Sequence, residues 1–218
     1  TFRMRFPLIY IAFYFASLLL ETIRELTQNK LLETQALYRA LYSRDALTGV
    51  YNRYGFNELM DRFFQQSQPN LALIILDIDY FKNINDRFGH LQGDLVLQSV
   101  ARLIQDAAGA TAGVCRWGGE EFAVLIPDCA NCRSVAASLC ERLRANEIMV
   151  ETGCVSLTVS IGAVLARDTG RCSAAQLVTL ADACLYLAKQ SGRDRVEYDE
   201  LDPVSHTDLP SGKKTALE

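Results

Sequence analysis

The sequence lacks any run of Lys or Arg, and its net charge is −4 at pH 7 with a pI near 5.3. Proteins that bind nucleic acids usually present a basic patch, so this composition argues against a nucleic-acid partner. Internal repeats are absent as well. The 218 residues suit one domain of ordinary size with appendages, and an apolar half of the composition is ample for a core.

Cysteines are not arranged as a disulfide framework, because the seven are scattered and odd in number. This usage favours the cytoplasm. Cys129 and Cys132 have the spacing of a redox pair or of half a zinc site, but there is no second CxxC, and the only histidines are His90 and His206. We therefore interpret the pair as small buried residues at a helix start.

Residues 1–42 differ in pattern from the rest. Residues 6–20 carry no charge, but these 15 residues are fewer than the roughly 20 of a membrane helix. They fit either the remainder of a membrane helix, which would tether the rest of the chain to the inner membrane, or an apolar helix that pairs with itself or with a sensory domain. Residues 21–42 lack Gly and Pro and predict a helix with an imperfect heptad. We interpret this helix as a dimerising stalk rather than a solvated linker.

Two acidic elements dominate the remainder. An apolar run at 71–76 ends in Asp77 and Asp79, which predicts a strand buried on both faces with both carboxylates on one side. At 118–121, Gly-Gly-Glu-Glu predicts a hairpin turn whose glycines let a ligand approach the backbone. If the two elements are neighbours, their carboxylates need a cation. Oxygen ligands favour Mg²⁺.

Other elements follow from hydrophobic spacing. We predict a loop at 81–93 and a second buried strand at 155–166, with strands on both sides of the Gly-Gly turn. Further helices are predicted at 54–66, 95–104, 131–146 and 173–190. This order is typical of an α+β sheet with helices packed on it. Residues 199–218 are expected to form a disordered tail.

Five motifs in order resemble the GGDEF diguanylate cyclase family over about Asp45 to Val196. The signature itself is Gly118-Gly-Glu-Glu-Phe122, and the other motifs are Asp45–Arg53, Asp77–Asp86, Gly89–Asp94 and Ala181–Arg193. The resemblance implies a ferredoxin-like cyclase/polymerase palm at 43–198, with a central antiparallel or mixed sheet, preceded by a long helix. It also implies that two GTP molecules are joined into cyclic di-GMP, a bacterial second messenger, with loss of two pyrophosphates at an antiparallel homodimer.

The resemblance further implies roles for single residues. Ligands for Mg²⁺ or Mn²⁺, two ions per GTP, would be the Asp77, Glu120 and Glu121 carboxylates and the Ile78 carbonyl. Glu120 would also activate the attacking hydroxyl, with Lys82 as a second catalytic residue. Phosphate contacts would come from Phe81 and Lys82, with further cationic contacts from Lys189 and Arg193, and guanine contacts from Asn85 and Asp94. The remaining substrate-binding residues would be Gly118 and Gly119, whose backbone a ligand can approach, and His90, for which a structural role is an equal alternative.

The sequence departs from the family pattern at two places. The product-inhibition motif Arg-x-x-Asp falls on Gly109–Ala112, which has neither charge, and Asp194 stands where Asn is usual. Some predicted site residues also have alternative roles outside the site. Lys189 and Arg193 could lie on a solvated helix face, and Asp94 could be a helix cap. The rival functions are a catalytically weak domain that binds GTP or cyclic di-GMP as a regulatory module, and a scaffolding stalk dimer. Turnover of GTP distinguishes the three.

Overall fold

The computed structural model describes residues 5–66, 70–151 and 153–201, and within them it leaves out the side chains of residues 5–9, 12, 35–41 and 171. It separates into two units, Thr1–Tyr42 and Ser43–Glu218. The first unit is the helix α1, Arg5–Tyr42, which joins the predicted apolar segment and the predicted stalk into one helix. Its described apolar side chains, such as Tyr14 and Leu26, are exposed. Among the described residues, no helix is long and apolar enough to cross a membrane.

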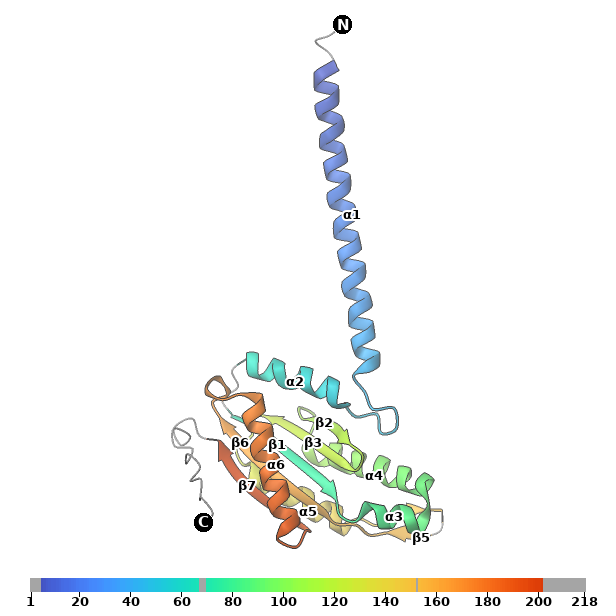
Figure 1. Ribbon diagram of the computed structural model, residues 1–218, viewed down its shortest axis with the longest axis vertical. Helices are drawn as coiled ribbons and strands as arrows, with labels where there is room; N and C mark the ends of the chain where they lie inside the picture. Colours follow the sequence, from blue (N-terminus) through green and yellow to red (C-terminus); the bar gives the residue numbers. More distant parts are fainter. Residues whose placement is uncertain (1–4, 67–69, 152, 202–218) are drawn as a thin grey trace, which may run out of the picture. The chain divides into compact units, whose positions relative to one another are not determined.

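The second unit is built on a five-stranded sheet in the order β2-β3-β1-β6-β7 (Figure 1). All neighbouring strands are antiparallel except β6 and β7, which are parallel. The strands are β1 Asn70–Ile78, β2 Gly113–Gly118, β3 Glu121–Pro127, β6 Val159–Arg167 and β7 Arg195–Leu201. The first four have the strand order of a ferredoxin-like fold, which confirms the predicted α+β palm.

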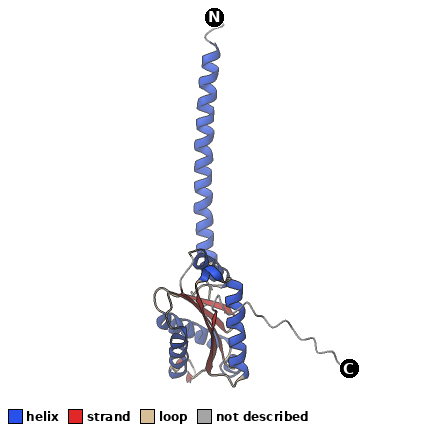
Figure 2. Ribbon diagram, turned by 90° about the vertical axis from the view of Figure 1, so that its left-hand side faces the viewer, coloured by secondary structure: helices blue, strands red, loops and turns tan. Residues whose placement is uncertain are grey.

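Helices cover both faces of this sheet (Figure 2). α2 (Arg53–Gln65) and α6 (Ala174–Gln190) pack on one face, while α4 (His90–Ala108) and α5 (Cys132–Ala145) pack on the other. β1 lies between the two layers, so alternate residues enter two cores, with Ile74 in one and Ile75 in the other. This double burial explains why its sequence is continuously apolar.

Local signals set several helix ends. The Asn52 side chain accepts from the Gly55 N–H at the start of α2, and Ser173 forms a capping box with Gln176 at the start of α6. These helices confirm the predictions at 54–66 and 173–190 to within a residue, and α5 confirms the one at 131–146 equally well. Cys132 is the first residue of α5 and is buried, and all seven cysteines are free thiols.

Three predictions are wrong. Residues 81–93 are not a loop, because α3 (Phe81–Phe88) and the first turn of α4 occupy them, which also excludes Asp94 as the helix cap. The strand predicted at 155–166 is divided, since β4 (Ile148–Val150) pairs with β5 (Gly153–Val155) and β6 begins only at Val159. Asp199, Glu200 and Leu201 belong to β7 rather than to a tail, and residues 202–218 lie outside the described residues.

Candidate active site

The two acidic elements meet at one end of the sheet. β1 and β3 are neighbours, and their register places Asp77 opposite Glu121. The Ile78 N–H donates to the Glu120 carbonyl at 3.4 Å, which ties the end of β1 to the turn. Gly119 has φ +50°, as the tight reversal between β2 and β3 requires. The predicted neighbourhood of the two motifs is therefore observed.

A lysine from α6 lies between the paired carboxylates. The Lys189 ammonium is 2.9 Å from Oδ2 of Asp77 and 3.9 Å from Oε1 of Glu121. Burial raises the pKa of Glu121, and the charges of Asp77, Asp182 and Glu120 raise it further, while Lys189 opposes the shift. The end of the sheet thus holds more negative charge than one lysine balances.

The second aspartate of the motif has a different environment. The Asp79 side chain is fully buried, and its oxygens accept from Oγ1 of Thr158 at 2.8 Å, from Oγ of Ser160 at 2.7 Å and from the Asp194 N–H at 3.0 Å. These donors occupy both oxygens, so Asp79 joins β1 to β6 and to the turn after α6. Asp77 keeps 15% of its side chain exposed and is the carboxylate that a ligand can reach.

The donor chemistry fits a hard divalent cation, although the described residues contain no group of three His, Cys, Asp or Glu side chains arranged as a finished metal site. Asp77 and Glu121 are adjacent oxygen donors. The pKa of Glu121 is raised chiefly by burial and further by the neighbouring carboxylates, and a cation bound there would favour its ionised form. Mg²⁺ prefers one or two carboxylates together with substrate phosphates. The predicted donors Glu120 and the Ile78 carbonyl lie next to this pair along the chain.

The predicted phosphate residues on α3 are at the start of a helix rather than in a loop. Phe81 is the first residue of α3 and is buried, whereas Lys82 in the same turn is exposed. Main-chain N–H groups of a first turn have no partner within the helix, so they are suited to anions. The correction from loop to helix therefore keeps the chemistry that the sequence suggested for these two residues.

The structure also brings the two predicted guanine residues together. A Cβ built on Gly93 would lie 1.9 Å from Oδ1 of Asn85, so α3 and α4 pack closely only because residue 93 is glycine. Asp94 follows directly and is half-buried, as is Asn85. His90 is exposed at the first residue of α4.

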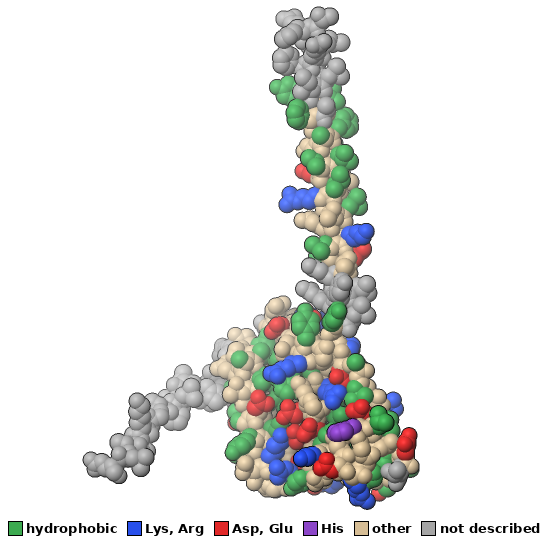
Figure 3. All heavy atoms as spheres, turned by 45° about the vertical axis from the view of Figure 1, so that its right-hand side comes forward, with side chains coloured by type: hydrophobic (Ala, Val, Ile, Leu, Met, Phe, Trp, Pro, Cys, Tyr) green, Lys and Arg blue, Asp and Glu red, His purple; other side chains and the backbone are tan. Residues whose placement is uncertain are grey.

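The surface around the turn is open. A Cβ built on Gly118 or on Gly119 would meet no atom within 4 Å, so these glycines leave room above the backbone. Figure 3 shows acidic side chains gathered on one face of the second unit, with Lys and Arg side chains around them. Carboxylates, Lys and Arg side chains and an open backbone together suit a nucleoside triphosphate with its metal ion.

Comparison with known proteins decides the family, because the profile of the family described as "Diguanylate cyclase, GGDEF domain" matches residues 42–195. This chain belongs to the GGDEF diguanylate cyclase family. Diguanylate cyclase DgcM of Escherichia coli is 37% identical over 190 residues, which are 85% of this chain and 45% of DgcM. The uncharacterized protein YhcK of Bacillus subtilis is 39% identical over 183 residues, 80% of this chain and 50% of YhcK. The chain thus spans about half the length of these relatives.

Solved GGDEF structures agree with the fold. The coiled coil and GGDEF domain of DgcB from Caulobacter crescentus, solved in complex with c-di-GMP, has a TM-score of 0.69 at 28% identity and covers 83% of this chain and 97% of its own. Diguanylate cyclase SiaD of Pseudomonas aeruginosa, in complex with its activator SiaC, has a TM-score of 0.68 at 33% identity, with 83% and 72% covered.

The position of the product-inhibition motif, Gly109–Ala112, lies in the link between α4 and β2. Gly109, Ala110 and Ala112 line a pocket of about 500 Å³ there, together with Asp106 and Arg44. The Arg44 guanidinium lies 3.9 Å from the centre of the Tyr51 ring. The pocket therefore keeps charged groups on its walls, although residues 109–112 supply none.

Sequence reasoning missed some side chains around the site. Asp182, two helical turns before Lys189, is close enough to raise the pKa of Glu121, and burial raises the pKa of Asp182 itself. The seven-residue spacing on α6 could have indicated it. Arg116 donates to the Gly119 carbonyl at 2.9 Å and pairs with Asp45 at 3.4 Å, so it connects the turn to the Asp45 motif. No local signal predicts the pairing of Arg116 with Asp45, because these residues are 71 positions apart in the sequence.

Proposed function

We propose that this GGDEF domain is an active diguanylate cyclase that condenses two GTP molecules into cyclic di-GMP and two pyrophosphates. The observation that supports this most is the Asp77, Glu121 and Lys189 cluster beside the open Gly118-Gly119 turn. A degenerate binding module would have no need of this intact acidic set.

In the proposed reaction, each step joins the ribose 3′-oxygen of one GTP to the α-phosphorus of the other, while the bond from that phosphorus to pyrophosphate breaks. Asp77, Glu121, Glu120 and the Ile78 carbonyl would hold Mg²⁺, which neutralises phosphate charge when bound. Glu120 accepts the proton of the 3′-hydroxyl. The α3 N-terminus with Lys82 binds the outer phosphates.

Guanine selection follows from the donors and acceptors on α3 and α4. A carboxylate at Asp94 accepts from the guanine N1–H and N2 amino groups, which adenine does not offer. Asn85, held against Gly93, supplies an amide beside it. A base without these groups leaves the two polar side chains unpaired, which can discriminate strongly.

The product contains two guanosines, but one domain has a single guanine site, so we propose that two domains face each other in an antiparallel homodimer. α1 would bring them together, since its exposed apolar residues need a partner. Without the charges of an inhibitory motif at 109–112, this helix becomes the main route by which an upstream signal controls the domains.

The experiment is GTP turnover by the full chain with Mg²⁺, with products identified by mass spectrometry. We expect cyclic di-GMP, and we expect Glu120→Gln to lower the rate by at least the ~10²-fold that is typical of a lost general base. Glu147→Gln, a change at an exposed residue between α5 and β4, is the matched control. GTP binding without turnover would favour the regulatory module, and near-normal turnover by Glu120→Gln would remove Glu120 from its role.

A further inference from the structure

The turn that follows α6 is held in an unfavourable conformation. Gly192, Arg193 and Asp194 have φ values of +109°, +64° and +49° in succession. Glycine reaches this region easily, but two successive residues with side chains do so only when the surroundings hold them. The Arg193 N–H donates to the Ala188 carbonyl at 3.0 Å, which closes the helix but leaves Asp194 to be fixed from elsewhere.

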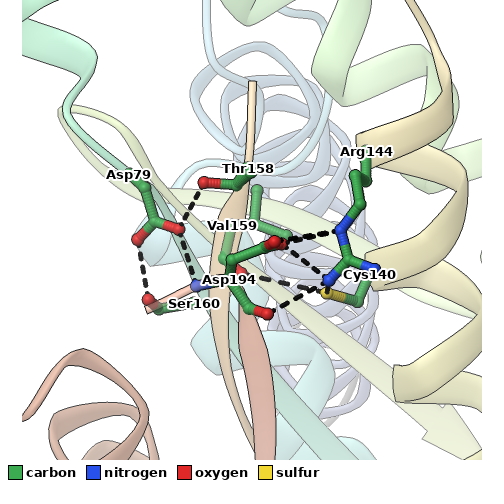
Figure 4. Close-up of polar contacts among 7 residues, drawn as sticks. All are labelled: Asp79, Cys140, Arg144, Thr158, Val159, Ser160 and Asp194. Carbon is green, nitrogen blue, oxygen red and sulfur yellow. Dashed lines mark hydrogen bonds and ion pairs between the residues drawn. The ribbon is translucent and has the colours of Figure 1, made fainter. Parts of the chain in front are cut away.

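Asp194 is fixed from two sides (Figure 4). Its N–H donates to the buried Asp79 carboxylate at 3.0 Å. On the other side, Arg144 from the last turn of α5 donates to the Asp194 carboxylate at 2.8 and 3.0 Å and to the Asp194 carbonyl at 3.1 Å. One guanidinium thus binds both the side chain and the main chain of the same residue.

Arg193 projects from the residue just before this anchor. Its Nε is 4.0 Å from Oδ1 of Asp79, and its guanidinium is 4.9 Å from the centre of the Tyr80 ring. Tyr80 precedes the first turn of α3, so Arg193 lies at the end of the sheet that carries the candidate phosphate contacts. Its direction depends on the backbone that Arg144 and Asp79 hold.

We propose that Arg144 is a positioning residue for catalysis. By binding Asp194, it keeps the left-handed turn in place so that the Arg193 guanidinium faces the phosphates of bound GTP. The role assigned to Arg193 rests on the proposed function. Asp194 stands where the family pattern has Asn, and the positive charge of Arg144 complements this substitution.

An ordinary stabilising ion pair is the alternative explanation. The side chains of Arg144 and Asp194 are 48% and 37% exposed, and exposed pairs contribute little to stability. If Arg144 only stabilised the fold, its loss would lower activity by the same factor whether or not Arg193 is present. If it acts through Arg193, the two losses are not independent.

The test is a double-mutant cycle in the full chain with Mg²⁺-GTP. We expect Arg144→Met to lower kcat/KM about fivefold, a loss of about 1 kcal/mol, chiefly through a higher KM. Arg193→Met should lose at least as much, and the double variant should fall less than about twofold below Arg193→Met. Arg142→Met, an exposed arginine on the same helix, is the matched control and should stay within about twofold of wild type.

A second variant guards against misfolding of Arg144→Met. Asn tolerates left-handed backbone, so Asp194→Asn keeps the turn accessible and removes only the charge. We expect it to give a smaller loss than Arg144→Met, again absent in the Arg193→Met background. Multiplicative losses in both cycles would overturn the proposal.

Two readouts do not depend on turnover. NMR of the Arg193 side chain should show a ring-current shift from Tyr80 in wild type that is reduced in Arg144→Met, and GTP titration should show the same non-additive cycle in affinity. An unchanged Arg193 resonance would overturn the positioning role even in an active enzyme. Wild-type protein without turnover would instead refute the proposed function, while the affinity cycle still decides the role of Arg144.

Discussion

The contact between α6 and β6 allows a sharp prediction at Gly162. A Cβ built there would lie 2.2 Å from the Ala181 carbonyl oxygen and 2.3 Å from the Leu185 nitrogen. Both are backbone atoms of α6, so no side-chain rotation relieves the clash. To restore ordinary contact distances, the helix must move away from the sheet by about 1 Å. Overpacking of this kind lowers the free energy of unfolding by about 1–3 kcal/mol. Alanine also lowers the conformational entropy of the unfolded chain, which offsets about 0.4–1 kcal/mol of that loss.

We therefore expect Gly162→Ala to lower Tm by about 2–8 °C. Because α6 carries Lys189, the same movement would disturb the 2.9 Å contact with Asp77, and a displacement of about 1 Å can cost about 10²-fold in rate. Thermal unfolding and GTP turnover of the purified variant measure the two effects. Gly118→Ala is the contrasting control, since it should keep Tm and lose activity. Wild-type Tm and turnover in Gly162→Ala would refute the packing argument.

Four further outcomes are expected. Gly93→Ala should push Asn85 aside and weaken GTP binding with little change in ATP binding. Titration with each nucleotide measures this, and equal effects on both nucleotides would contradict it. Because the pKa of Glu121 is raised in the folded state, its contribution to stability is fully present below the ordinary pKa of 4.5 and is lost as the pH rises through the raised pKa. Glu121→Gln should therefore raise Tm at neutral pH but not near pH 4. Deleting residues 1–42 should lower activity in dilute protein, and a coiled coil fused at Tyr42 should restore it in a phase-dependent way. Micromolar cyclic di-GMP should inhibit only weakly, and tight noncompetitive inhibition would refute that expectation.

The predicted elements that proved correct are those whose burial pattern is simple. β1 is buried on both faces along almost its whole length, so its apolar run could be recognised without tertiary information. The Gly-Gly turn is equally local, because the chain must reverse there. The neighbourhood of Asp77 and Glu121 then followed from placing the two elements side by side.

The errors occurred where tertiary packing overrides local pattern. α3 is short and mostly polar, and Gly89 and Gly93 around it favour a loop until the packing of Gly93 against Asn85 is known. β7 is an edge strand with Arg, Glu and Asp along it, and Leu201 is its one buried residue, so it lacks a strand signature. Arg144 meets Asp194 across 50 residues, a contact that no sequence spacing indicates.

The two aspartates of the first motif show why such a site needs its scaffold. Asp77 lies near the end of β1 and Asp79 lies just beyond it, yet their surroundings differ. Asp79 is satisfied by hydroxyl and N–H donors, while Asp77 pairs with Lys189 and lies opposite Glu121. Burial, together with the charges of Asp77, Asp182 and Glu120, raises the pKa of Glu121, so its carboxylate is less favourable there than in water. The sheet can support that cost because β1 is anchored in two cores. Electrostatic strain at the end of β1 therefore favours a cation, which is what a metal-dependent nucleotide site requires.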